Sequence, residues 1–213
     1  MVRFVVMAAG LATRMGKDKL VLPWKDTTVL GYVLQTVLEA LILQEQRFVE
    51  SSHSGVTEVY VVARHPMEIY LTTDCIRRFH ACGGVWIQVP SPKPLAETIR
   101  SGLQDINSKV HWIGFLPGDQ VGITAPRLAD CLQQILLVSP DFLVPFSGDK
   151  AGSPVFFHKR YVPELLALQG EKGGREVLYR YPELWEKYPV EESLFLDVDT
   201  PEQYNALRGQ ISK

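Results

Sequence analysis

Small and basic residues follow the first apolar run of the chain. Residues 8–19 read Ala-Ala-Gly-Leu-Ala-Thr-Arg-Met-Gly-Lys-Asp-Lys and come directly after the apolar residues 2–7. Small residues let a ligand approach the backbone, and glycine permits a tight turn. Backbone N–H groups in such a loop form a concave anion site, and the cations Arg14, Lys17 and Lys19 can neutralise outer phosphates. This combination is typical of a triphosphate-binding loop.

The loop departs from the two common phosphate-binding patterns. Five residues separate Gly10 from Gly16, where the Walker A pattern has four, and Asp18 follows Lys17, where that pattern has Ser or Thr. The G-x-G-x-x-G pattern of dinucleotide-binding proteins is also absent. On spacing alone, a surface turn with ordinary basic residues is an equal alternative.

Acidic residues stand at the ends of two further predicted strands. Asp119 follows the predicted strand 110–116, and Asp197 and Asp199 lie at the end of the predicted strand 194–198. Residues at i and i+2 of a strand point to the same face, so Asp197 and Asp199 are expected to lie together. Carboxylate oxygens, waters and substrate phosphates are the ligands that Mg²⁺ prefers. Two acidic strand ends beside a cationic loop therefore favour nucleotide–Mg²⁺ chemistry.

Two of these acidic residues, Asp119 and Asp199, also have a structural interpretation. Asp119 can cap a turn or the next helix, a common role for Asp. Thr200 followed by Pro201 is a good helix start, which gives a structural account of Thr200 and of Asp199 before it.

Strand and helix signals alternate along the rest of the chain. Apolar runs predict strands at 2–7, 58–63, 85–89, 110–116, 142–146, 154–157 and 194–198. Helical spacing predicts helices at 29–42 with a Thr27 or Thr28 cap, and at 67–81, 95–106, 126–138 and 202–211. This order predicts an α/β fold with a doubly wound, mostly parallel sheet between two helical layers, which is Rossmann-like. The loops after the strands then meet along one edge, where ligands bind.

Composition limits the possible classes of function. The 213 residues and 46% hydrophobic content predict one domain, 1–213, with a nucleotide-binding half of about 1–120 and an acceptor-binding half of about 121–213. A net charge of −2 gives no sign of a nucleic-acid-binding surface. Three cysteines without paired spacing indicate a reducing compartment. No signal peptide and no apolar run long enough for a bilayer appear, so a cytoplasmic protein without membrane contact is expected.

The sequence resembles the MobA-like nucleotidyltransferases, and most closely their molybdenum cofactor cytidylyltransferase branch. Six segments carry the resemblance, namely 8–23, 98–103, 116–120, 152–157, 170–175 and 197–202. The first contains A-A-G-x-x-x-R-M-G-x-x-K-L, and the last reads D-V-D-T-P-E. The pair Ala8-Ala9 suits the cytidylyl branch better than the guanylyl branch, which usually has a second glycine at this point.

The resemblance implies transfer of CMP from CTP to the phosphate of the molybdenum–pterin cofactor, with release of pyrophosphate. The implied catalytic residues are Arg14, Lys19 and Asp119. The implied nucleotide-binding residues are Ala8, Ala9, Gly10, Leu11, Ala12, Thr13, Arg14, Lys19, Thr98 and Gly118. The acceptor is expected at Gly152, Ser153, Pro154 and Arg175. The implied cofactor is Mg²⁺, bound by Asp119 with Asp199 or Asp197, of which Asp199 is preferred because it begins the shared D-T-P-E run.

Several positions depart from the pattern of the family. Val121 follows Gln120 where proline is usual, Thr98 replaces serine, and Gln203 replaces an acidic residue. Two other functions stay open: a nucleotidyltransferase for another phosphorylated acceptor such as a sugar phosphate, and a non-catalytic chaperone that hands the molybdenum cofactor to a hydroxylase. Retention of Arg14, Lys19 and the acidic strand ends argues against the chaperone.

Overall fold

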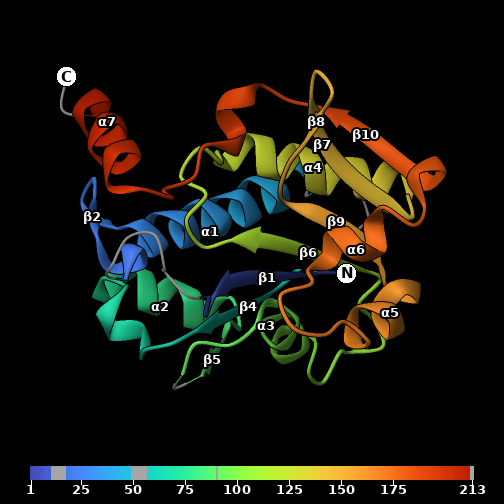
Figure 1. The fold of residues 1–213 in the computed structure, drawn as a ribbon, viewed down its shortest axis with the longest axis horizontal. Coiled ribbons are helices and arrows are strands. Elements are labelled where there is room, and N and C mark those ends of the chain that lie inside the picture. The colour runs from blue at the N-terminus through green and yellow to red at the C-terminus, as the bar shows by residue number, and fades with distance from the viewer. Residues whose placement is uncertain (11–17, 49–56, 90, 212–213) are drawn as a thin grey trace.

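A central sheet organises the molecule (Figure 1). The computed structural model describes residues 1–10, 18–48, 57–89 and 91–211. Within them, eight strands form a sheet in the order β10-β7-β9-β6-β1-β4-β5, with β8 paired to β7. The strands are β1 (Val2–Ala8), β4 (Thr57–Ala63), β5 (Val85–Gln88), β6 (Trp112–Pro117), β7 (Phe142–Ser147), β8 (Lys150–Ala151), β9 (Val155–His158) and β10 (Trp185–Pro189).

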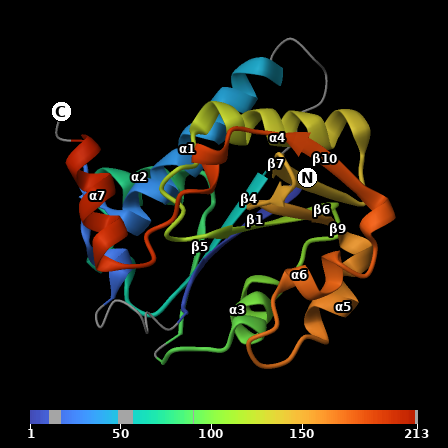
Figure 2. The ribbon, with the colours of Figure 1, turned by 45° about the horizontal axis from the view of Figure 1, so that its top comes forward.

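The pairing directions confirm the predicted fold class. β1 pairs in parallel with β4 and β6, β4 with β5, and β7 with β10, while β9 runs antiparallel between β6 and β7. The mostly parallel sheet lies between two helical layers (Figure 2). One layer holds α1 (Val29–Phe48) and α4 (Ala125–Val138), and the other holds α3 (Leu95–Gly102), α5 (Val162–Leu166) and α6 (Gly174–Leu178).

Both faces of β1 are buried because helices cover each of them. Phe4 and Val6 belong to the core under α1 and α4, whereas Val5 belongs to the core under α3 and α5. A strand buried on both faces reads as a continuous apolar run, which is why the sequence identified it. The predicted cap of α1 is also confirmed, because the Thr28 hydroxyl accepts a hydrogen bond from the Gly31 N–H at 3.0 Å.

Two predicted helices have different bounds. The predicted helix 67–81 is split into η2 (Met67–Ile69) and α2 (Thr73–Ala81), because Thr72 caps α2 by accepting a hydrogen bond from Cys75 N at 3.3 Å. The predicted helix 95–106 ends at Gly102, and Asp105 then has a φ of 48°.

The prediction of a last strand at 194–198 is wrong. Residues 192–195 form the 3₁₀ helix η5 (Glu192–Phe195), and the chain then runs past the loop that follows β6. Its hydrogen bonds go to that loop, from Gly122 N to Leu196 O at 2.9 Å and from Val198 N to Asp119 O at 3.1 Å. The edge strand beyond β7 is β10, which was not predicted.

Short elements complete the fold. The 3₁₀ helix η1 (Lys19–Val21) leads to a hairpin of β2 (Pro23–Trp24) and β3 (Thr27–Thr28). α7 (Pro201–Ile211) lies beside β2, where the Tyr204 hydroxyl donates to Pro23 O at 2.6 Å (Figure 1). The 3₁₀ helices η3 (Lys159–Tyr161) and η4 (Pro182–Leu184) precede α5 and β10. Among the described helices, none is both long enough and apolar enough to cross a membrane.

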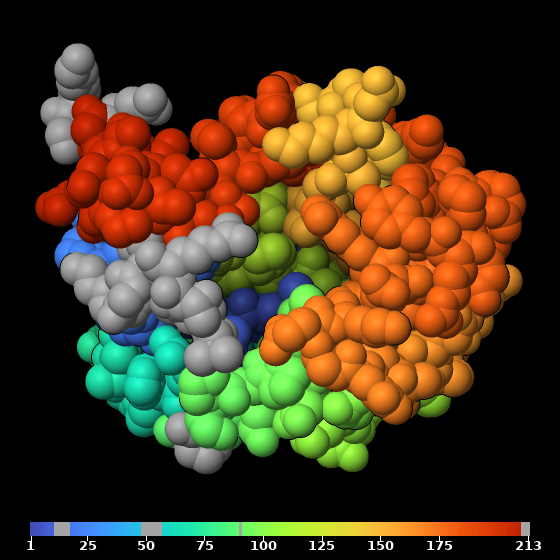
Figure 3. Space-filling view, viewed as in Figure 1, coloured from blue at the N-terminus to red at the C-terminus, as the bar shows by residue number. Residues whose placement is uncertain are grey.

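The carboxyl ends of β1 and β6 border a hollow in the surface (Figure 3). In this view, residues of the N-terminal strand lie deep in the hollow, and segments near the C-terminus form part of its rim. The ends of parallel strands in an open α/β sheet are the expected place for a ligand.

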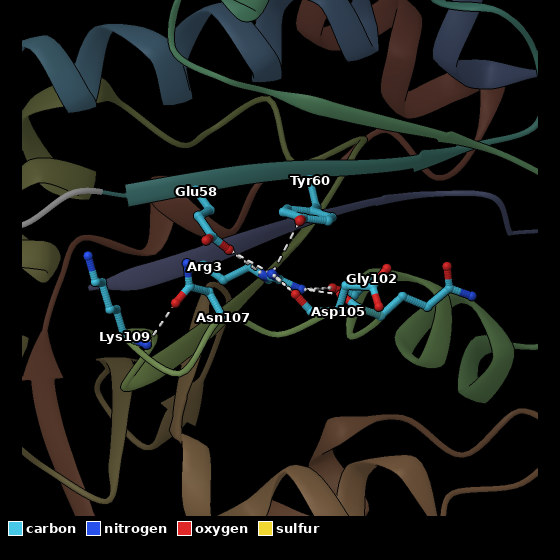
Figure 4. A network of polar contacts seen from close by, with 8 residues as sticks. Arg3, Glu58, Tyr60, Gly102, Asp105, Asn107 and Lys109 are labelled. Carbon is cyan, nitrogen blue, oxygen red and sulfur yellow. Dashed lines mark hydrogen bonds and ion pairs between the residues drawn. The ribbon is translucent and has the colours of Figure 1, made fainter.

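A buried arginine anchors the C-terminal end of α3, which is the end remote from the hollow (Figure 4). The Arg3 side chain on β1 is fully buried, pairs with Glu58 at 2.7 Å and lies over the Tyr60 ring. It also donates to the carbonyl of Gly102, the last residue of α3, at 3.5 Å, and to those of Gln104 at 2.6 Å and Asp105 at 3.0 Å in the turn that follows. A cation at the C-terminal end of a helix pairs with carbonyls that have no partner within the helix, so Arg3 holds the end of the helix whose first turn faces the hollow.

Candidate active site

Lys19 lies between two carboxylates, one of which belongs to the loop after β6. Its Nζ is 2.7 Å from Asp199 Oδ1 and also forms a close ion pair with Asp119 Oδ2. The three side chains come from η1, from the loop after β6 and from the segment before α7. The structure therefore brings together three of the residues selected from the sequence, although they lie far apart in the chain.

Among the described residues, acidic groups outnumber basic ones in this cluster. Burial disfavours the charged form of Lys19, but the two carboxylates outweigh this effect and raise the pKa of its ammonium. Burial, and then repulsion from Asp199 and Asp119, raise the pKa of the Asp197 carboxyl. Among the residues that the structure describes, three carboxyl groups thus lie near one ammonium group, an arrangement that attracts further positive charge.

Backbone hydrogen bonds set the distance between the two acidic segments. The bond from Val198 N to Asp119 O joins the residue after Asp197 to the backbone of Asp119. Gly122 continues the contact and lies so close to η5 that a Cβ on it would come within 2.0 Å of Ser193 O. Only glycine fits at this approach.

The start of α7 holds Asp199 in place. The Thr200 hydroxyl accepts a hydrogen bond from Gln203 N at 3.2 Å, and Gln203 Oε1 accepts from the N–H groups of Asp199 and Thr200, both at 3.1 Å. This is a capping box, in which the N-cap and N3 side chains satisfy each other's backbone donors. Gln203 therefore retains the capping function at the position where the family usually has an acidic residue, and the structural role predicted for Thr200 is confirmed.

The residues present fit a divalent cation. Asp119 and Asp199 each place an oxygen against one ammonium nitrogen, so the two carboxylates can reach a single cation. No group of three or more His, Cys, Asp or Glu side chains arranged around a metal position occurs in the part of the chain that the structure describes. Two carboxylates, with waters and substrate phosphates, are a typical Mg²⁺ ligand set, and oxygen donors also suit Mn²⁺.

A first cavity of about 570 Å³ lies beside the end of β1. Its lining includes Gly10, Lys93 and Thr98. Thr98 is 1% exposed. Its hydroxyl donates to the carbonyl oxygen of Pro94, the residue that precedes α3, at 3.4 Å. Ala8 and Ala9 are buried at the end of β1, and Ala9 accepts a backbone hydrogen bond from Lys93 at 3.4 Å.

Gly118 brings the loop after β6 close to β1. Its N–H donates to Met7 O at 3.0 Å, and a Cβ on Gly118 would lie 3.1 Å from that same oxygen. A side chain at this position would therefore push apart the two strand ends that carry Gly10 and Asp119.

A second cavity of about 750 Å³ adjoins the first. Both cavities are lined by Met7, Leu95, Pro117 and Glu171. The second has an apolar wall that includes Phe115 and Phe157, whose rings meet edge to face at 5.7 Å. Of the residues predicted to bind the acceptor, Ser153 and Arg175 line it.

Gly152 and Pro154 have a different position. They do not line either cavity, and Gly152 lies against the Phe195 ring, where a Cβ would come within 2.0 Å of a ring carbon. Their contribution to the second cavity is to shape the backbone around Ser153.

Gln120 was not singled out from the sequence. It is 3% exposed, and its Nε2 donates to Ser153 O and to Leu194 O, both at 2.8 Å. It therefore ties the loop carrying Asp119 to the second cavity and to η5. Its place directly after Asp119 was the available signal, but its partners are backbone carbonyls, which have no sequence signature.

Asp18 was also missed, although it directly precedes Lys19. Its carboxylate accepts from Leu20 N at 3.0 Å and from the Tyr70 hydroxyl at 3.1 Å, and it pairs with Arg64 at 2.7 Å. The predicted residues Leu11, Ala12, Thr13 and Arg14 lie outside the described residues.

Comparison with known proteins agrees with this geometry. Residues 4–184 match the MobA-like NTP transferase domain. The chain belongs to the MobA-like NTP transferase family. Nucleotidyl transfer is therefore its class of reaction, and the family resemblance noted in the sequence is confirmed.

Relatives of this MobA-like chain match it along nearly its whole length. The purine catabolism protein PucB of Bacillus subtilis is 26% identical over 214 residues, which cover 98% of this chain and 96% of PucB. The structure of Rv0371c from Mycobacterium tuberculosis has a TM-score of 0.71 at 23% identity, covering 98% of this chain and 97% of Rv0371c. Rv0371c has also been solved as a complex with manganese, with a TM-score of 0.69, 23% identity and 98% coverage of both chains. The molybdopterin-guanine dinucleotide biosynthesis protein A of Archaeoglobus fulgidus has a TM-score of 0.60 at 14% identity, covering 99% of this chain and 98% of that protein.

Proposed function

We propose that the protein transfers a nucleoside monophosphate, CMP from CTP, to the phosphate of a molybdenum–pterin cofactor. The observation that carries this proposal is the pairing of Lys19 with Asp119 and Asp199, because Asp119 follows closely after Pro117, which lines two adjoining cavities. One cavity adjoins Gly10 and suits the nucleotide, and the other suits the acceptor. We further propose a nucleotide-binding half before about residue 120 and an acceptor-binding half after it.

The lining of the second cavity suits a flat heterocycle that carries a phosphate. Phe115, Phe157 and Val155 offer apolar and aromatic surface, which suits a ring system. Lys172 and Arg175 lie at the same cavity and can pair with the acceptor's phosphate. The side chains of Gln169, Glu171 and Glu176 at the same cavity can hydrogen-bond to the polar edge of such a ring.

The chain needs no nucleophile of its own for this reaction. The acceptor's phosphate oxygen attacks the α-phosphorus of the nucleotide, the bond to the β-phosphate oxygen breaks, and pyrophosphate leaves with the electron pair. The protein then acts by positioning the substrates and by stabilising charge. In this proposal, the backbone N–H of Gly10 and the ammonium of Lys19 hold the negative charge of the leaving pyrophosphate. Arg14, from the same loop, is proposed to share this role.

Asp119 and Asp199 are the residues proposed to bind a divalent cation. Asp199 is preferred to Asp197 because its oxygen reaches the same cation position as Asp119. When bound, Mg²⁺ or Mn²⁺ supplies charge neutralisation at the phosphate oxygens. The complex of Rv0371c with manganese supports the use of a divalent cation, and the Archaeoglobus protein supports a molybdopterin acceptor. A molybdenum hydroxylase in the cytoplasm is the proposed recipient of the product.

The test is pyrophosphate release with CTP, GTP or ATP, each with and without molybdopterin and with and without Mg²⁺. Release that needs CTP, Mg²⁺ and molybdopterin supports the proposal. Pyrophosphate release with a sugar phosphate in place of molybdopterin would identify the sugar phosphate as the acceptor. Tight binding of the molybdenum cofactor without turnover would indicate a chaperone. Asp119→Asn is expected to lower turnover by about 10²–10³, the usual effect of removing one electrostatic catalytic group. An unchanged turnover would contradict the role of Asp119.

A further inference from the structure

We propose that Lys19 occupies the cation position between Asp119 and Asp199 when no nucleotide is bound, so that a divalent cation enters only together with the nucleotide. This inference rests on the proposed function, because it concerns the same site. It adds the condition under which the metal can bind there.

The ion pairs are the first observation. One ammonium nitrogen lies within ion-pair distance of an oxygen on each carboxylate, and the side chains of Lys19 and Asp119 are only 17% and 15% exposed. A second cation between the same oxygens would lie within about 4 Å of the ammonium, where like charges repel strongly outside bulk water. Lys19 must therefore leave these oxygens before they can bind a divalent cation.

The anchoring of Asp18 shows which part of Lys19 can move. The Asp18 carboxylate caps η1 through Leu20 N, pairs with Arg64 and accepts a hydrogen bond from the buried Tyr70 hydroxyl. Leu20 is itself buried. The backbone on both sides of Lys19 is thus held, and the exchange takes place by rotation of the flexible lysine side chain.

The nucleotide provides the new partner for the ammonium group. Gly10 and Pro117 line the first cavity, and Asp119, which pairs with Lys19, is two residues after Pro117, so phosphates bound there lie near this side chain. Without phosphates, a lysine that leaves the carboxylates gives up two ion pairs. With phosphates, the ammonium gains new anionic partners while the carboxylates gain the divalent cation. Metal and nucleotide are then coupled, and each increases the affinity for the other.

The test measures Mn²⁺ binding directly, by electron paramagnetic resonance of free Mn²⁺, without nucleotide and without turnover. Lys19→Met removes the ammonium, and it is expected to bind Mn²⁺ at least tenfold more tightly than the wild type. Lys19→Gln repeats the test with a polar side chain. Lys25→Met is the matched control, because Lys25 is exposed and contacts Tyr32 instead, and it should bind Mn²⁺ like the wild type. Addition of a non-hydrolysable CTP analogue should tighten Mn²⁺ binding much more in the wild type than in Lys19→Met.

The outcomes separate this inference from the proposed function. If Mn²⁺ binds both Lys19 variants no more tightly than the wild type, but Asp119→Asn abolishes binding, the metal site stands and the exchange is refuted. If Mn²⁺ shows no saturable binding in any variant, with or without the analogue, both the metal site and the exchange are refuted. Circular dichroism and urea unfolding establish that each variant is folded.

Discussion

The backbone N–H of Val198 donates to the carbonyl oxygen of Asp119 at 3.1 Å. This hydrogen bond joins the loop after β6 to the segment before α7, and it places the Asp119 carboxylate near that of Asp199. The acidic cluster therefore depends on a loop-to-loop contact and not on two neighbouring strands.

Gly122→Ala tests this contact. The new methyl group would meet Ser193 O at 2.0 Å and force residues 193–198 away from the loop that carries Asp119. We expect a loss of about 1–3 kcal/mol of stability, as in other overpacked sites, and a larger loss of Mn²⁺ affinity and turnover. Urea unfolding and Mn²⁺ titration measure the two effects.

Gly209→Ala is the control for this variant. Gly209 lies in α7, and a Cβ there meets no atom within 4 Å. Alanine favours a helix by up to about 1 kcal/mol over glycine, so this variant should be as stable as the wild type or more so, with normal turnover. Normal Mn²⁺ affinity in Gly122→Ala would show that the contact does not position the acidic cluster.

Gln120→Leu removes the two hydrogen bonds that tie the second cavity to the loop after β6. The carbonyls of Ser153 and Leu194 would lose a buried donor, which costs about 1–3 kcal/mol for each group left unsatisfied. We expect lower stability and a raised KM for the acceptor, with a smaller change in the KM for CTP. Gln46→Leu, on an exposed position of α1, controls for the loss of a surface glutamine.

Gln120→Glu separates hydrogen bonding from packing. The side chain keeps its size, but an acceptor oxygen replaces the amide donor and faces two carbonyl oxygens. This variant should therefore be as damaging as Gln120→Leu. An acceptor KM equal to that of the wild type would mean that Ser153 is held by other contacts.

Asp197→Asn is expected to stabilise the nucleotide-free protein at neutral pH. The folded protein raises the pKa of Asp197 above its ordinary value of 3.8, because burial and the charges of Asp199 and Asp119 oppose ionisation. A raised folded pKa means that folding is penalised once the group ionises. This penalty is absent below the pKa of Asp197 in the unfolded state. It grows as pH rises toward the pKa in the folded state and is complete above it.

Urea unfolding from pH 4 to pH 7 measures this effect. The stability of Asp197→Asn minus that of the wild type should be near zero at the acidic end and positive at pH 7, and added salt should reduce the difference. A difference that is independent of pH, or that favours the wild type at pH 7, would contradict the assignment of repulsion at this site.

The strands and helices that were predicted correctly are those whose signal is local. The apolar run of β1 and the Thr28 cap of α1 belong to their own segments. The convergence of Lys19 and Asp119 also followed, because the ends of parallel strands share one edge of the sheet. The segment at 194–198 was misread because an apolar, extended run looks the same whether it pairs with a sheet or with a loop. Gln120 and Arg3 were missed because they bind main-chain carbonyls, which any residue can supply.

Arg3→Met tests whether Arg3, which lies at the end of the sheet remote from the hollow, supports α3. The variant keeps an apolar stem but leaves the Glu58 carboxylate and the carbonyls of Gln104 and Asp105 without their donor. Breaking a buried ion pair by removing one partner costs about 3–5 kcal/mol, so a clear fall in the urea midpoint is expected. Glu58→Met in the same chain removes the unpaired carboxylate and should recover part of the loss. Because α3 carries Thr98, which lines the first cavity, Arg3→Met should also raise the KM for the nucleotide. A double variant no more stable than Arg3→Met alone would show that the lost carbonyl contacts, and not the uncompensated carboxylate, cause the instability.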